Sequence, residues 1–170
     1  MKKIILGLTI GLLLISCSSS DGNSSNSSNS SGNFMWRCKI NGVLYEWSGN
    51  EGENFSQGAS IDFTNSLILK NNDLMISPTN FLQNNSPGNY TFSQSSGKYC
   101  VATFFGESYS SYGGSMNFII TSVTPYTSQT YDVISRKLTG TFSGTLKNVD
   151  PITGGTLLIT EGSFVAMNID

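Results

Sequence analysis

The stretch from residue 34 to residue 47, Phe-Met-Trp-Arg-Cys-Lys-Ile-Asn-Gly-Val-Leu-Tyr-Glu-Trp, decides the fold class of this chain. Apolar side chains alternate on both sides of Asn41-Gly42, the strongest short signal for a two-residue β-hairpin turn. Such a turn fixes the register of the two strands, and it collects the apolar side chains on one face. The pairs expected to face each other are Ile40 with Val43, Cys38 with Tyr45, Trp36 with Trp47 and, on the outer face, Arg37 with Glu46.

Alternation of the same kind continues along the chain, and no helical period is present. Gly140 and Gly144 fall on an inward face of one strand, which predicts either strong coiling of the strand or close contact with a neighbouring sheet there. The sequence therefore predicts an all-β domain, a single antiparallel β-sandwich or a lipocalin-like β-barrel of about nine to ten short strands. Beyond the hairpin, the clearest expected strands are 67–70, 74–77, 88–93, 98–105, 115–124, 137–147, 157–160 and 163–169, with weaker patterns at 60–64 and 131–134.

Composition excludes several functions. The chain has 170 residues, of which 12% are charged, with a net charge of −2 and no histidine. Without histidine there is no Ser–His or Cys–His catalytic pair and little basis for a zinc site. The charge balance offers no electrostatic footprint for nucleic acid. We therefore expect no enzyme, no cofactor, no metal and no nucleic-acid partner.

The first residues predict a secretory signal peptide at 1–16. Lys2 and Lys3 precede a short apolar run over 4–15, which is too short to span a bilayer as a helix. The run ends Leu14-Ile15-Ser16-Cys17, which resembles the lipobox of bacterial lipoproteins. The resemblance implies that the Cys17 thiol receives a diacylglycerol through a thioether, that the chain is cleaved before Cys17, and that the new amino group is acylated with a palmitate-type chain. Several acyl chains would anchor the protein stably to a membrane.

Residues 17–33 are predicted to be the lipidated cysteine followed by a flexible tether, because everything after Cys17 up to Asn33 is Ser, Asn, Gly or Asp. Such a segment has no apolar groups to bury and stays flexible. Residues 34–170 then form the all-β domain. The expected location is the bacterial outer membrane, on either its periplasmic face or the cell surface.

The ends of this domain carry a second resemblance. Cys38-Lys39-Ile40-Asn41-Gly42 near the start, Gly140-Thr-Phe-Ser-Gly144 and Gly162-Ser-Phe164 near the end are similar to the corresponding segments of small uncharacterised lipoproteins of Bacteroidota. These motifs are a turn and two sheet strands. The resemblance implies an all-β lipoprotein domain and no particular activity.

Two cysteines, Cys38 and Cys100, fall on expected strands. Outside the cytoplasm such a pair tends to be oxidised. A disulfide would close a loop of about 63 residues, worth roughly 4 kcal/mol. The alternative is two buried free thiols that pack as small apolar residues. Neither arrangement indicates catalysis, because no Cys-x-x-Cys spacing is present.

The candidate ligand-binding residues are tyrosines. Tyr109 and Tyr112 lie in a Ser/Gly-rich segment, 107–114, expected to be a flexible loop, and Tyr126 begins a second such loop. Tyrosine in such a setting supplies rigid contact area with adaptable hydrogen bonding. The sequence favours a non-enzymatic module that recognises a glycan or a protein through these loops. The alternatives are a lipocalin-like carrier of a small apolar ligand lined by Trp36, Trp47 and Phe142, or a purely structural lipoprotein.

Overall fold

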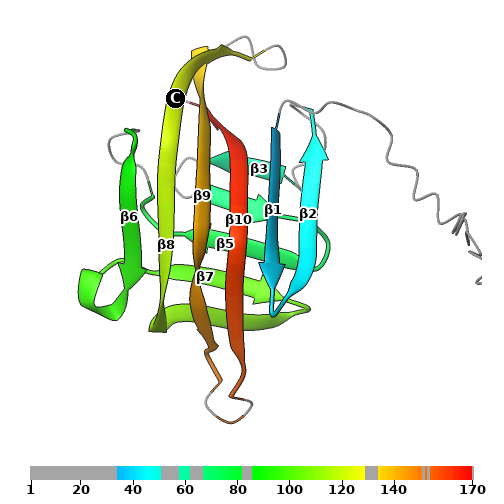
Figure 1. Cartoon of the computed structure of the whole chain (residues 1–170), viewed down its shortest axis with the longest axis vertical. Helices are drawn as coiled ribbons and strands as arrows, with labels where there is room; N and C mark the ends of the chain where they lie inside the picture. The colour runs from blue at the N-terminus through cyan, green and yellow to red at the C-terminus, as the bar shows by residue number, and fades with distance from the viewer. Residues whose placement is uncertain are drawn as a thin grey trace, which may run out of the picture.

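A computed structural model describes residues 34–50, 58–61, 67–81, 86–128, 134–150, 152 and 154–169. These residues form ten β-strands and one short 3₁₀ turn, η1 (Figure 1). The all-β prediction is confirmed. The elements are β1 (Phe34–Ile40), β2 (Val43–Gly49), β3 (Gly58–Ile61), β4 (Leu67–Lys70), β5 (Leu74–Pro78), β6 (Gly88–Ser93), η1 (Gln94–Ser96), β7 (Cys100–Phe104), β8 (Glu107–Thr127), β9 (Ile134–Asn148) and β10 (Thr156–Ile169).

The strands form one sheet that curls into a flattened barrel. Pairing runs from β10 through β3, β4, β5, β7, β8 and β9 back to β10, with the β1–β2 hairpin and β6 added at the edges. In Figure 1 the strands β2, β1, β10, β9, β8 and β6 run vertically in front, and β3, β5 and β7 cross behind them. The ring is closed by a short parallel pairing between β10 and β3, whereas every other pairing is antiparallel.

The β1–β2 hairpin has the predicted register in full, including Trp36 opposite Trp47 and Arg37 opposite Glu46. Asn41 and Gly42 both have positive φ, 49° and 87°, as a two-residue primed turn requires. One detail differs from the prediction: Val43 is exposed rather than inward. It begins β2, the edge strand of the sheet, so no further strand covers it.

The segment 107–114, expected to be a loop, is the first part of β8, and this prediction was wrong. Residues 107–110 pair with β7, and residues 115–120 pair with β6, so β8 belongs to both layers. The strand turns the corner between them at 111–114, where its register against β9 shifts. A Cβ on Gly114 would collide with the carbonyl oxygen of Thr145. The Gly-Gly pair that suggested a loop instead permits a bend within a strand.

The two closing strands expected at 157–160 and 163–169 are one strand, β10, interrupted by a bulge. Ile159 faces Gly144 of β9 and Gly162 faces Phe142, so β10 carries one extra residue at this point. Glu161 takes a positive φ of 53° in the bulge. The extra residue switches the inward face from odd to even positions. That switch breaks the alternation, which is why the sequence suggested two strands.

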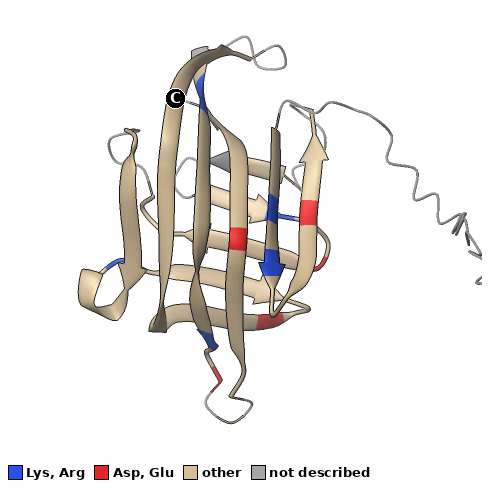
Figure 2. Ribbon diagram, in the orientation of Figure 1, with Lys and Arg blue, Asp and Glu red and all other residues tan. Residues whose placement is uncertain are grey.

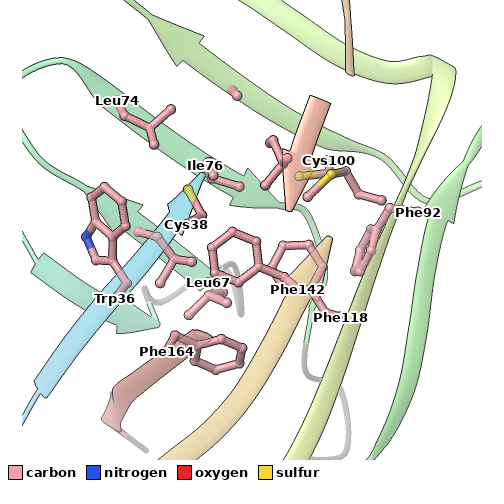
Figure 3. Close-up of a cluster of buried hydrophobic side chains, with 14 of the residues drawn as sticks. Trp36, Cys38, Leu67, Leu74, Ile76, Phe92, Cys100, Phe118, Phe142 and Phe164 are labelled. Carbon is pink, nitrogen blue, oxygen red and sulfur yellow. The ribbon is translucent and has the colours of Figure 1, made fainter. Parts of the chain in front are cut away.

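The interior of the barrel is filled by side chains, many of them aromatic (Figure 3). Phe118 lies at its centre, with ring centroids 5.2 Å from Phe81, 5.6 Å from Phe92 and 5.4 Å from Phe142. Distances of this size are those of favourable edge and offset-stacked aromatic pairs. The domain is therefore held together by a packed cluster of rings that joins both layers.

Glycines of β9 and β10 make this cluster fit. Gly140 is directly opposite Phe164, and Gly162 is directly opposite Phe142. A Cβ on Gly140 would lie 2.6 Å from the Phe164 ring, and a Cβ on Gly162 would lie 2.7 Å from the Phe142 ring. Each ring therefore occupies the space that the opposite glycine leaves free. The predicted close approach at Gly140 and Gly144 is confirmed.

A methyl group added at Gly162 should be costly, because it meets both the ring and the carbonyl oxygen of Phe142. We expect Gly162→Ala to lower the free energy of unfolding by about 1–3 kcal/mol, the usual cost of overpacking. Urea unfolding of the two proteins measures the difference. The matched control is Gly113→Ala, whose Cβ would meet only the flexible side chain of Lys147. Equal unfolding midpoints for both variants would contradict this account of the core.

Candidate functional site

Tyr109 is not available as a surface ligand contact, and that prediction was wrong. Its side chain is only 6% exposed and belongs to the barrel core. Its hydroxyl donates a hydrogen bond of 2.8 Å to Oε2 of Glu107, which also accepts one from the side-chain amide of Asn148. The bond to the Glu107 carboxylate raises the pKa of Tyr109, because the carboxylate stabilises the protonated phenol. Tyr109 thus fixes the base of the β9–β10 hairpin.

Tyr112 remains on the surface, and the structure gives it an aromatic neighbour, Tyr99. The two side chains are 55% and 37% exposed, with ring centroids 5.8 Å apart and planes inclined by 32°. The side-chain amide of Gln94, in η1, donates a hydrogen bond of 3.0 Å to the Tyr112 hydroxyl. We call Tyr99, Tyr112 and Gln94 the tyrosine platform. It presents two ring faces beside a polar amide.

The platform is held by backbone contacts on each of its segments. The carbonyl oxygen of Tyr99 accepts hydrogen bonds from both the backbone N–H and the hydroxyl of Thr79. The backbone N–H of Tyr112 donates to Oγ of Ser110. The η1 turn is capped at Ser93, whose hydroxyl accepts from Ser96. The two rings therefore start from ordered backbone rather than from a flexible loop.

Tyr99 and Gln94 were not predicted from the sequence, although one signal pointed to Tyr99. Phe105-Gly106 forms a two-residue turn between β7 and β8, with φ of 47° and 84°. That turn sets Phe104 opposite Glu107 and Val101 opposite Ser110. Two residues further along the same register, Tyr99 comes opposite Tyr112. A turn without Asn or Asp at its first position is a weak signal, so the pairing was not predicted.

Tyr126 lies at the end of β8 and not in a loop, so its predicted setting was also wrong. Its ring contacts the buried ring of Phe34 edge-on, with centroids 5.3 Å apart. It is half-buried and separate from the tyrosine platform. The contact ties the end of β8 to the start of β1, which is a structural role.

The disulfide expected between Cys38 and Cys100 is not formed: both thiols are free and buried. Figure 3 shows the two side chains at separate positions within the core. Burial raises the pKa of the Cys38 thiol to about 12 and raises that of Cys100 as well. Both thiols therefore pack as small apolar side chains and are poor nucleophiles at neutral pH.

The two tryptophans differ in their setting. Trp36 is fully buried, and its indole N–H donates a hydrogen bond of 3.2 Å to the carbonyl oxygen of Lys70. Trp47 is half-buried and packs against the core. Phe142, the third residue expected to line a carrier cavity, is in contact with the rings of Phe118 and Phe164. The three side chains expected to line a carrier cavity are therefore packed against other residues of the protein.

The described part of the chain holds no group of three Asp, Glu, Cys or His side chains placed to bind a metal. It also has no helix of the length and hydropathy needed to cross a bilayer. Several predictions concern residues outside the described ranges: the signal peptide at 1–16, Cys17 and the tether at 17–33, and most of the weak strand at 131–134. Searches found no matching protein-family model, no matching curated protein and no matching solved structure.

The state of the two core cysteines can be checked by alkylation and peptide mass mapping. In unreduced protein at pH 8 we expect both Cys38 and Cys100 to be labelled after denaturation and neither to be labelled in the native state. Burial keeps the reagent out, and the raised pKa keeps the thiols protonated. Recovery of a peptide pair that joins Cys38 to Cys100 would contradict the free-thiol structure.

Proposed function

We propose that this chain is a cell-envelope lipoprotein of the bacterial outer membrane whose all-β domain binds a glycan without catalysis. The observation that carries the proposal is the tyrosine platform, two exposed rings held on ordered backbone with a side-chain amide beside them. The C–H face of a sugar ring is apolar and stacks on such rings, while its hydroxyls bond to amide groups. The lipobox-like sequence ending at Cys17 supports the anchor.

The size of the platform favours a sugar over a protein partner. At exposures of 55% and 37%, the two rings offer on the order of 200 Å² of accessible surface. A stable protein interface buries about 800 Å² on each partner. A few sugar rings can be held by an area that is too small to hold a folded protein. Val101, two residues along the chain from Tyr99, is 37% exposed and adds apolar area beside the platform.

The alternative of a small-molecule carrier has less support. A carrier needs interior space, whereas the inward side chains of the described strands are in contact across the barrel. Glycines that would otherwise leave space are covered by phenylalanine rings. A packed interior directs ligand binding to the outer surface.

Loss of either ring of the platform should weaken binding. We expect Tyr112→Ala and Tyr99→Ala each to weaken binding to glycans selected on an array by about tenfold, because each removes one stacking surface. Titration calorimetry of the full chain in mild detergent measures the affinities. Both side chains are exposed, so the unfolding midpoint should change little.

The matched control is Phe105→Asn, which removes another exposed aromatic ring outside the platform. Phe105 is 64% exposed and has a φ of 47°, a conformation that asparagine tolerates. It should bind like the wild type. Equal weakening in all three variants, or unchanged affinity in the two tyrosine variants, would exclude the platform as the glycan site.

The anchor is tested by fractionation of cells that express the full chain. Cys17→Ala removes the thiol on which a thioether-linked lipid depends, so we expect the variant to leave the membrane fraction or to accumulate unprocessed. Cys38→Ala is the matched control and should fractionate like the wild type. Wild-type behaviour of Cys17→Ala in both processing and fractionation would rule out lipid anchoring at Cys17.

A further inference from the structure

A shallow groove of about 370 Å³ lies on the outer face of the front layer, across β1, β10, β9 and β8. It shares no residue with the tyrosine platform. Figure 2 shows few charged residues on this face, with blue positions on β1 and a red one on β10. Its polar and charged lining residues are Arg37, Asn117, Thr141, Ser143, Glu161 and Ser163.

The strand register lines these residues up across the sheet. Arg37 of β1 is opposite Ser163 of β10, and Ser163 is opposite Thr141 of β9. Thr141 is opposite Ile119 of β8, and in a parallel row Ser143 is opposite Asn117. Three interstrand steps make the first row about 14 Å long. A linear ligand that lies across the strands would therefore meet the cation at one end and hydroxyl groups along its length.

The β10 bulge lies at this groove, because Glu161 and Gly162 belong to both. The extra residue at Thr160–Glu161 shifts the register against both β9 and β1. Glu161 points to Lys39, and their charged groups form an ion pair of 2.8 Å. The acidic side chain of the groove is thus neutralised by a cation from β1.

Arg37 has no such partner among the residues that the structure describes: no hydrogen bond or ion pair involves its guanidinium. Glu46 is directly opposite on β2, yet the two form no ion pair and Glu46 does not line the groove. An unpaired guanidinium presents a planar set of donors that matches a carboxylate. Charge complementarity at this end of the groove therefore selects an anion.

We propose that this groove binds an acidic polysaccharide, with a sugar carboxylate on Arg37 and the sugar hydroxyls along the Ser/Thr/Asn row. Hydroxyls both donate and accept, as the Ser and Thr side chains of the groove do. Apart from Ile119, Gly162 and the ring of Phe142, which is only 3% exposed, the lining is polar, so it offers a peptide few apolar contacts. The groove is a second site and does not depend on the tyrosine platform.

The test is titration of the full chain in mild detergent with oligogalacturonate, which carries a carboxylate on every ring. The same oligomer in fully methyl-esterified form is the neutral control ligand. We expect the wild type to bind the acid at least tenfold more tightly than the ester, because a hydrogen-bonded charge is lost in the ester. Arg37→Gln should remove that preference, and Arg37→Lys should restore it only in part.

Lys98→Gln is the matched control, since it removes one exposed positive charge outside the groove. It should keep the wild-type preference. Tyr112→Ala should also keep it, which separates failure of this site from failure of the tyrosine platform. No binding of the acid by the wild type, an unchanged preference in Arg37→Gln, or an equal loss in Lys98→Gln would overturn the proposal.

Discussion

The fit between phenylalanine rings and glycines across β9 and β10 is the constraint on which the rest of the structure depends. The ring of Phe142 packs over Gly162, and the ring of Phe164 packs over Gly140. Two large rings and two glycines, which have no side chains, therefore share one layer of the core. Because the glycines have no side chains, β9 and β10 can lie close to their neighbours while the rings of Phe142 and Phe164 reach Phe118 at the centre. The bulge in β10 is part of the same arrangement, because it brings Gly162 to the inward face opposite Phe142.

The same constraint connects the core to the outer surface. The interior is occupied by rings, the two proposed ligand sites lie on the outer surface, and the corner and bulge that complete the barrel also shape that surface. The corner of β8 at 111–114 brings Tyr112 into contact with Tyr99. The bulge of β10 turns Glu161 toward Lys39 beside the front groove. Both candidate surfaces lie where a strand departs from regular pairing.

The sequence patterns correctly predicted those features of the fold that depend on neighbouring residues. Alternation and Asn41-Gly42 were enough for the β1–β2 register, and the bounds of β4 and β6 match the predicted strands. The tyrosine site could be predicted only in part, because Ser/Gly-rich sequence at 107–114 looks the same in a loop and in a strand that bends. Whether Tyr109 faces inward depends on which layer its segment joins, and the choice between paired and free cysteines depends on where β1 and β7 place the two thiols in the core. Those are tertiary relations that alternation does not encode.

We propose that the domain has a packed interior and binds at its outer surface. Native mass spectrometry of the full chain, purified from bacterial envelopes in mild detergent, tests it most directly. We predict the mass of the protein with its covalent modifications and no stoichiometric apolar molecule that denaturation releases. A discrete apolar ligand, bound one to one and released on denaturation, would contradict the packed interior and make the domain a carrier.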